Sequence, residues 1–144
     1  SERELAEKGE FKSLTPPCSF KVMKGYIFRR SGPAVFGVEV LAGRLRQKSE
    51  VMNSSAKMIG TIRQLQEKGE NIDEASQGSE VAVSINEVIM DRHVHEGDEL
   101  FTVPRSNDAK ILLEKFSSRL TINEIETLNK IVEIKRKTNP LYAF

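Results

Sequence analysis

GYIFRRSGPAVFGVEV, residues 25–40, is the stretch that decides the fold. Its apolar residues belong to two short runs, Tyr26–Phe28 and Ala34–Leu41, the second of which continues one residue past the stretch, and Ser31-Gly32-Pro33 between them favours a turn. Short runs rich in aromatic and β-branched residues are typical of strands. This stretch therefore predicts two strands joined by a turn.

The same pattern continues along the chain on both sides of this stretch. Further short apolar or alternating runs cover Phe20–Met23, Glu50–Met52, Lys57–Leu65, Val81–Val88 and Leu100–Val103. They are separated by turn formers at Lys24-Gly25, Ala42-Gly43, Asn53-Ser54-Ser55, Lys68-Gly69, Gln77-Gly78 and Glu96-Gly97-Asp98. Short strands at this spacing indicate a barrel or a sandwich. We expect a small closed β-barrel, because glycines recur where strands must bend and closure removes exposed edges.

After Val103-Pro104 the apolar residues follow a helical period instead. Ser106 is the expected N-cap of a first helix that carries Ile111, Leu112, Lys115 and Phe116. Thr121-Ile122-Asn123-Glu124 forms a capping box for a second helix, and Lys135-Arg136-Lys137 in its last turn complement the helix dipole. The fold class is thus mainly β, a closed barrel followed by two C-terminal α-helices.

These patterns divide the chain into three parts. Residues 1–17 are expected to be the end of a connector helix and a linker, because helical spacing there is followed by Thr15-Pro16-Pro17. Residues 18–104 form the barrel, and residues 105–144 form a helix pair packed on it. A single cysteine, Cys18, excludes an internal disulfide, and no run is long and apolar enough for a membrane span or a secretory signal. A cytoplasmic location is expected, with no membrane contact.

The charges are unevenly distributed although the formal net charge is only +1. Between residues 21 and 63 the acidic residues are only Glu39 and Glu50, against the basic residues Lys21, Lys24, Arg29, Arg30, Arg44, Arg46, Lys48, Lys57 and Arg63. From residue 64 to residue 101 acidic residues dominate. The basic half suits nucleic acid, since a polyanion responds to the local field; the alternative is that solvated strand edges merely segregate by sign.

The chemistry of an enzyme is missing from the sequence. The chain has no phosphate-binding loop of the form G-x-x-x-x-G-K-[ST], and no serine or cysteine is spaced to pair with a histidine. His93-Val94-His95 supplies two metal ligands at most, so no metal site is expected. We therefore expect a non-catalytic binding module. In residues 25–40, arginine forks can grip phosphate while Tyr26, Phe28 and Phe36 offer ring faces to a base, unless Phe28 and Phe36 belong to the core.

An ordered series of motifs gives the sequence a family resemblance. Residues 25–40, then Gly43-Arg44-Leu45, Ile59-Gly60-Thr61-Ile62, residues 78–85 and Gly97-Asp98-Glu99-Leu100, together resemble the fourth domain of translation initiation factor 5B. That factor is the archaeal and eukaryotic counterpart of bacterial initiation factor 2. The motif order covers about residues 18–103, and the helical tail fits the extension of the archaeal and eukaryotic branch.

The resemblance implies a role in translation initiation. The full-length factor of this family is a ribosome-dependent GTPase that joins ribosomal subunits, and its fourth domain holds the acceptor end of initiator methionyl-tRNA. GTP and magnesium would bind to the parent protein and no cofactor to this fragment. The implied tRNA- and methionine-binding residues are Arg29, Arg30, Phe36, Gly37, Val38, Arg44, Arg63, Glu80 and Val81. Bacterial factors have cysteines at the positions of Val38 and Val81, so a site that requires a formyl group is not expected here.

The helical tail resembles a docking site for the C-terminal tail of initiation factor 1A. The implied groove and its cationic rim comprise Lys110, Ile111, Lys115, Phe116, Arg119, Leu120, Ile122, Ile125, Leu128 and Lys130. The alternative is that these apolar residues only pack the helices on the barrel. Two other functions also stay open: a protein-interaction module without tRNA contact, and a barrel from an elongation-type GTPase or a ribosome-associated protein.

Overall fold

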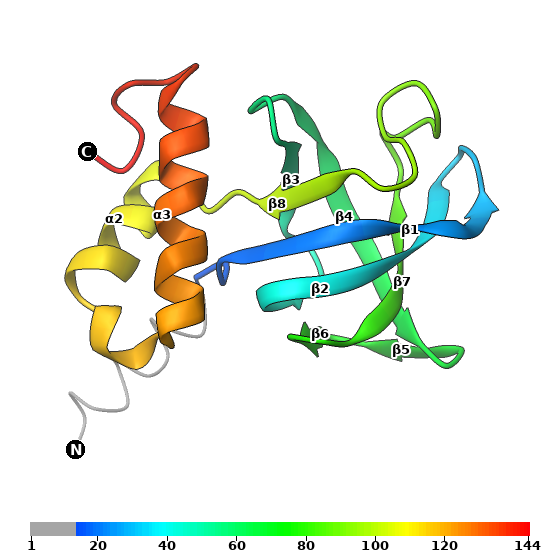
Figure 1. Cartoon of the computed structure of the whole chain (residues 1–144), viewed down its shortest axis with the longest axis horizontal. Helices are drawn as coiled ribbons and strands as arrows, with labels where there is room; N and C mark the ends of the chain where they lie inside the picture. Colours follow the sequence, from blue (N-terminus) through cyan, green and yellow to red (C-terminus); the bar gives the residue numbers. More distant parts are fainter. Residues whose placement is uncertain (1–13) are drawn as a thin grey trace.

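β-Strands are the main regular structure of the computed structural model, which describes residues 14–144 (Figure 1). In chain order the elements are β1 (Cys18–Arg29), β2 (Ala34–Arg46), β3 (Glu50–Asn53), β4 (Met58–Glu67), β5 (Glu70–Ile72), β6 (Glu74–Ser76), β7 (Glu80–Ile85), β8 (Glu99–Thr102), α2 (Ser106–Glu114), the 3-10 turn η1 (Ser117–Arg119) and α3 (Ile122–Arg136). The sequence predicts a connector helix and a linker at residues 1–17. Residues 1–13 of this segment lie outside the described part of the chain.

Antiparallel pairing closes the long strands into a barrel. The strand order is β1-β8-β3-β4-β7-β2, and β2 pairs with β1 again. The short strands β5 and β6 extend the sheet beside β4 and β2. A closed barrel leaves few unpaired edges, which is the physical reason to expect closure from many short strands. The predicted fold class, a β-barrel followed by two helices, is confirmed.

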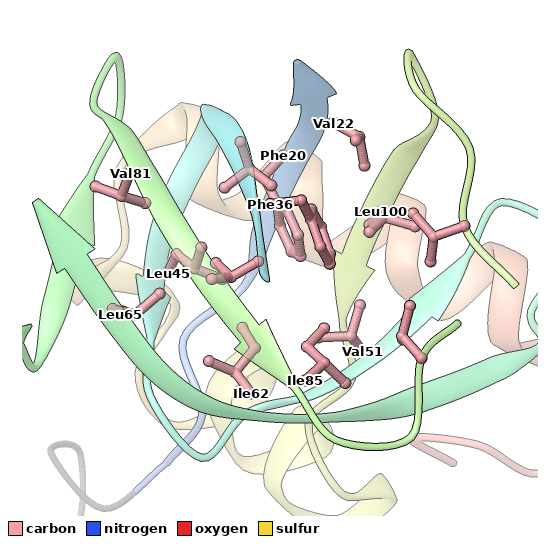
Figure 2. Packing of buried hydrophobic residues seen from close by; sticks show 14 of the residues in the cluster. Phe20, Val22, Phe36, Leu45, Val51, Ile62, Leu65, Val81, Ile85 and Leu100 are labelled. Carbon is pink, nitrogen blue, oxygen red and sulfur yellow. The ribbon is translucent and has the colours of Figure 1, made fainter. Parts of the chain in front are cut away.

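The inside of the barrel is filled by alternate residues of each strand. On β2, Phe36, Val38 and Val40 point inward and are buried, whereas Glu39 is exposed. Figure 2 shows Phe20 and Phe36 in the middle of the barrel, with Leu45, Ile62, Leu65, Ile85 and Leu100 packed around them. The period of two seen in the sequence thus selects the buried face of each strand.

The first predicted break is a bulge rather than a turn. Lys24-Gly25 lies inside β1, where the pairing of Val22 with Val38 is followed by that of Ile27 with Phe36. β1 therefore contains extra residues that bend away from β2, and Gly25 adopts a φ of 82° at this bend. The residues predicted as two strands form one bulged strand, because pairing with β2 resumes beyond the glycine.

Two further predicted boundaries differ from the structure, and two short strands were not predicted. β2 continues through Ala42-Gly43 to Arg46, because Gly43 takes a φ of 75° where a side chain would overlap the Pro17 carbonyl oxygen. β7 ends at Ile85, not at Val88, and the chain then forms a long loop to β8. The short strands β5 and β6 were not predicted, since neither has enough residues to show a period.

The two helices pack against one side of the barrel through a second core. It comprises apolar residues from β3 and β8, among them Met52 and Phe101, and from the helices, including Leu112, Phe116 and Leu128. Figure 1 shows α2 and α3 beside the ends of β1 and β8. The predicted packing of the helix pair on the barrel is observed.

The two predicted helix starts have different outcomes. The capping box of α3 is present, with Glu124 N donating to Thr121 Oγ1 at 3.1 Å and Thr121 N donating to Glu124 Oε1 at 3.3 Å. The prediction for Ser106 is wrong, because Arg105 is the N-cap of α2 and makes no side-chain cap. The Ser106 hydroxyl instead accepts from Ala143 N at 2.8 Å, which ties the C-terminal residues to the start of α2.

Charged residues join the barrel to α3. Arg44 on β2 forms ion pairs with Glu74 at 3.1 Å and with the largely buried Glu124 at 3.5 Å. Beside them, Gly43 N donates to Asn123 Oδ1 at 2.8 Å. These contacts fix the first turn of α3 on the strand, and they pair a residue of the basic stretch with two acidic residues. The ion pair with Glu74 therefore brings a residue of the basic stretch together with a residue of the acidic stretch.

Candidate ligand site on the β1–β2 hairpin

A pocket opens on the outer face of the barrel beside the bulge of β1. It has a volume of about 460 Å³ and is lined by Met23, Tyr26, Phe28, Val35, Gly37, Gln66, Lys68, Gly69, Glu80, Val81 and Ala82. We call this the hairpin pocket. Its walls come from β1, β2, β7 and the turn between β4 and β5, so only the closed barrel brings them together.

Gly37 allows the bulge of β1 to lie close to β2. A Cβ atom at this position would be 2.8 Å from the Cβ of Tyr26, closer than ordinary van der Waals contact. The glycine therefore lets the base of the tyrosine side chain sit directly over the strand. Close approach of two segments is one of the few reasons for a glycine inside a strand.

Two exposed aromatic rings form the rim of the hairpin pocket. The side chains of Tyr26 and Phe28 are 50% and 63% exposed, unusually large fractions for rings on a strand. Their centroids are 6.4 Å apart and their planes meet at 72°, an edge-to-face arrangement. Exposed rings next to an apolar hollow can stack on a planar ligand or contact an apolar side chain.

The structure separates the three rings that the sequence offered to a ligand. Phe36 is completely buried inside the barrel, as the core alternative held, whereas Phe28 and Tyr26 lie outside. The reason is the bulge, which ends the regular alternation of β1 after Val22 and turns both rings toward solvent.

Five predicted pocket residues fall into two groups. Gly37, Glu80 and Val81 line the hairpin pocket. Phe36 and Val38 have no exposed surface and point into the core, so a ligand in this pocket would not touch their side chains. Neighbouring residues of a strand point to opposite faces, and a continuous run such as 36–38 cannot all face one ligand.

The four predicted arginines also occupy different places. Arg29 and Arg30 follow Phe28 at the end of β1 and are exposed; Arg29 Nε donates to the Ser31 carbonyl at 2.9 Å, and Arg30 pairs with Asp91. Arg44 is engaged at the junction with α3. Arg63, on β4, lines a separate polar hollow with Gln47, Gln64, Asn71, Ile72 and Asp73. Only Arg29 and Arg30 thus continue the strand that forms the pocket.

Sequence reasoning missed several pocket residues that come from elsewhere in the chain. Lys68 and Gly69 form the turn between β4 and β5, and Gln66 pairs with Ala82 on β7. Lys21 and Lys24 line a slightly smaller hollow, of about 420 Å³, that shares Met23, Tyr26 and Glu80 with the hairpin pocket. The sequence predicted a turn at Lys68-Gly69, but the position of this turn at the hairpin pocket depends on the pairing of β4 with β7.

Other candidate chemistry is not assembled in the described residues. Residues 14–144 contain no group of three or more histidine, cysteine or acidic side chains placed to hold a metal ion. The Cys18 thiol is buried in the core, and burial raises its pKa, so it stays protonated. Across the described helices, none is long and apolar enough to cross a membrane.

Comparison with known proteins gives this arrangement a family. Residues 16–101 match the model of elongation factor Tu domain 4, which covers β1 to β8. The chain belongs to the elongation factor Tu domain 4 family. The domain 4 barrel is therefore the unit that carries the hairpin pocket, and α2 and α3 lie beyond the matched residues.

Relatives of the whole chain, helices included, are translation initiation factors of archaea. A probable translation initiation factor IF-2 from Ignicoccus hospitalis is 41% identical over 98% of this chain, and one from Methanopyrus kandleri is 46% identical over 90%. The chain spans only 23% and 22% of these proteins. The resemblance to initiation factor 5B is confirmed: the crystal structure of GDP-bound aIF5B from Aeropyrum pernix superposes with a TM-score of 0.91 at 36% identity, over 99% of this chain and 24% of that one.

The predicted docking residues on the helices beyond the domain 4 match are partly core. Phe116, Leu120 and Leu128 are buried in the second core, while Ile111 and Ile125 are partly buried against it. The cationic side chains of Lys115 and Arg119 lie over the Phe116 ring, 5.4 and 5.9 Å from its centroid. Lys110 is partly buried on α2, and Lys130 pairs with Glu99 at 3.5 Å. Ile122, at the start of α3, is 78% exposed, so packing in the second core does not account for this apolar residue.

Proposed function

We propose that this chain acts in translation initiation by holding the acceptor end of initiator methionyl-tRNA in the hairpin pocket. The observation that carries the proposal is the pair of exposed rings, Tyr26 and Phe28, at the rim of an apolar pocket whose strand ends in Arg29 and Arg30. Exposed rings can stack on unpaired bases and cations can contact the phosphates. The apolar hollow beside them can hold the amino acid side chain.

The lining of the pocket suits a methionine side chain. Met23, Val35 and Ala82 supply apolar surface, and the soft thioether of methionine adapts well to such irregular hollows. Glu80, which is exposed, is the acidic residue among those that line the pocket, and its carboxylate can pair with the free α-amino group of methionine. A formyl group would remove that positive charge, so we expect the unformylated methionine to be preferred.

The rings and cations suit the nucleotides that precede the amino acid. Bases stack on exposed aromatic side chains with about 1–3 kcal/mol each, and every base offers such a face. Arg29, together with Lys24 and Lys68 around the pocket, can contact phosphates of the same strand. Arg30 contributes less directly, because its guanidinium also pairs with Asp91.

A double substitution of the two rings tests the proposal. Tyr26→Ala with Phe28→Ala is expected to weaken binding of methionylated initiator tRNA by at least about tenfold, because each lost stacked base contributes about 1–3 kcal/mol. Both rings are half-exposed or more, so the fold should tolerate their removal. Ile122→Ala with Leu141→Ala, two exposed apolar residues on the helical side, is the control and should bind normally.

The difference between aminoacylated and deacylated tRNA is the second measurement. The unmodified chain should prefer the methionylated form, and the ring variant should lose both affinity and this preference. Equal binding of both forms by the unmodified chain would contradict methionine recognition, and a purely protein-binding module would remain. Arg29→Ala with Arg30→Ala should reduce the slope of log affinity against log salt by about one for each lost phosphate contact.

The helices contribute a second part of the proposal, the docking of initiation factor 1A. Exposed Ile122 beside partly buried Ile125 favours an apolar contact at the start of α3, with Lys115 and Arg119 as its cationic rim. Ile122→Asp is expected to abolish binding of a peptide from the C-terminal tail of that factor, measured by NMR titration, without unfolding α3. Shifts confined to barrel strands would contradict this docking site.

The remaining activities of the parent factor would lie outside this chain. The curated relatives are about four times as long, and we propose that GTP and magnesium bind in the rest of such a protein, where contact with the ribosomal subunits drives hydrolysis. The isolated chain should therefore neither bind nor hydrolyse GTP in a nucleotide-binding assay.

A further inference from the structure

A second cleft lies on the barrel between the β3–β4 turn and the loop that joins β7 to β8. It has a volume of about 450 Å³ and is lined by Asn53, Lys57, Met58, Ile59, Glu87, Arg92, His93, His95 and Asp98. We call it the loop cleft. It shares no lining residue with the hairpin pocket.

The loop cleft combines unpaired cations with acidic groups that are already engaged. Within residues 14–144, Lys57 and Arg92 form no ion pair. The Asp98 carboxylate accepts from His95 N at 2.9 Å and lies 3.7 Å from His95 Nδ1. Glu87 accepts a longer hydrogen bond, 3.4 Å, from Thr61 N. An anionic ligand would therefore find two cations without an ion-pair partner, beside two carboxylates that already accept hydrogen bonds from backbone N–H groups.

Both cations are presented by turns with fixed backbones. The Asn53 side-chain oxygen accepts from Ser55 N at 2.9 Å and from Lys57 N at 3.0 Å, which holds the turn that carries Lys57. Around Arg92, the Ile89 carbonyl accepts from Arg92 N at 3.2 Å and from His93 N at 3.0 Å. Cations on rigid turns lose little freedom when an anion binds, which favours binding.

A histidine supplies a third donor to the same cleft. His93 Nδ1 accepts from Ile89 N at 3.0 Å, so a neutral His93 ring carries its proton on Nε2. That N–H group is a hydrogen-bond donor with no partner among the described residues. Lysine and arginine are usual donors to phosphate oxygens, and the imidazole N–H adds a third donor in the same cleft.

The loop that forms this cleft is attached to the end of the β1–β2 hairpin. Met90 N donates to the Arg30 carbonyl at 2.9 Å, and Asp91 pairs with the Arg30 guanidinium. Asp91 sits at a φ of 69°, in the left-handed region that aspartate tolerates better than most residues. This turn engages Asp91 with Arg30 and leaves Arg92 next to it for the cleft. A cationic series therefore runs from Arg29 and Arg30 to Arg92 and Lys57.

We propose that the loop cleft binds the phosphate backbone of RNA, as a second contact for the tRNA whose acceptor end occupies the hairpin pocket. This inference rests on the proposed function of that pocket. The acceptor strand continues into a duplex stem, and a strand that leaves the rings along Arg29 and Arg30 next meets the turn that carries Arg92. The contact reads charge and shape, not base sequence.

The inference is tested by removing two positive charges from the loop cleft and comparing the result with the removal of two positive charges from the helical side. Lys57→Gln with Arg92→Gln is compared with Lys135→Gln with Lys137→Gln at the end of α3, which removes the same charge from the helical side. Two RNA probes are used. One is a stem-loop with a single-stranded, methionylated ACCA end, and the other is the methionylated ACCA fragment alone. Thermal unfolding of each variant verifies the fold.

The cleft variant is expected to bind the stem-loop about tenfold more weakly and to show a salt slope lower by about two, since each lost phosphate contact reduces the slope by about one. Its affinity for the short fragment should be unchanged, and the control variant should bind both probes normally. Equal losses in the cleft and control variants would overturn the inference, because they would indicate a non-specific charge effect. Weaker binding of the short fragment by the cleft variant would also overturn the inference, because the cleft would then belong to the acceptor-end site.

Failure of the proposed function would look different. In that case the ring variant, Tyr26→Ala with Phe28→Ala, would bind the stem-loop normally and methionylation would have no effect on any variant. The cleft variant would still lose affinity and salt slope for the stem-loop, which would leave the loop cleft as an independent RNA contact. Normal stem-loop binding by the cleft variant would refute the inference even if the ring variant failed to bind.

Discussion

Gly37→Ala is the substitution that most directly probes the hairpin pocket. The added methyl group would lie 2.8 Å from Tyr26 Cβ, and ordinary contact requires 3.4 Å or more. The backbone at Gly37 is not in the left-handed region, so the substitution itself carries no conformational strain. The whole effect must therefore come from displacement of the β1 bulge, by at least several tenths of an ångström, at the rim of the pocket.

The expected loss is larger for ligand binding than for folding. Overpacking costs about 1–3 kcal/mol where the surroundings are rigid, but Tyr26 is half-exposed on a bulge that can move outward. Replacement of a strand glycine by alanine also recovers about 0.5–1 kcal/mol. We expect the free energy of unfolding to fall by no more than about 2 kcal/mol. A displaced Tyr26 loses its stacked base, worth about 1–3 kcal/mol, so the affinity for methionylated tRNA should fall by about tenfold.

Gly78→Ala is the matched control with the opposite expectation. Gly78 has a φ of 87° and open space around its Cβ direction, so alanine there costs about 1–2 kcal/mol of backbone strain and touches no part of the pocket. Urea unfolding followed by circular dichroism gives the stability of both variants, and filter binding gives their affinities. The reasoning is refuted if Gly37→Ala binds methionylated tRNA normally, or if Gly78→Ala loses affinity to the same extent.

Two further predictions concern stability. Thr121→Ala removes the capping-box acceptor of α3 and should lower the free energy of unfolding in urea by about 1 kcal/mol; Thr138→Ala, beyond the end of the helix, should have little effect, and equal losses would refute the role of the cap. Burial raises the pKa of the Cys18 thiol and of the Tyr142 hydroxyl, the latter also through Asp108 and Glu50, above their ordinary values of 9.0 and 10.0. The unfolded chain then loses these protons first, so stability should decrease as the pH rises above about 9, and Cys18→Ala should reduce that decrease. A stability that is flat from about pH 8 to pH 11 would contradict this.

The sequence predicted the barrel because its local signals agree with one another. Alternation such as that of Val38, Glu39 and Val40 assigns each strand a buried and an exposed face, and the glycine breaks limit strand length. The capping box at Thr121 likewise identified the start of α3, since a cap depends only on residues within one turn of the helix. Ser106 shows the limit of that reasoning, because its hydroxyl found a partner at Ala143, far along the chain.

The candidate site was predictable only in part. The stretch 25–40 contains Tyr26, Phe28 and Gly37, and the family motif added Glu80 and Val81, all of which line the hairpin pocket. The sequence could not separate Phe28 from Phe36, because the bulge at Gly25 decides which ring faces solvent. Strand alternation after a bulge depends on where pairing resumes, and pairing is a property of two segments.

By itself, the sequence determined where the long strands and the two helices lie, apart from some of their ends, and which motif series relates the chain to initiation factors, because these follow from local periodicity, caps and residue order. The tertiary structure alone decided that Lys68 and Glu80 line the same pocket, that Arg44 is engaged with Glu124, and that Arg92 and Lys57 share a cleft next to Arg30. Each of these contacts joins segments that are distant in the sequence. They exist because an antiparallel sheet can close only when non-consecutive strands pair, and local signals contain no information on those partners.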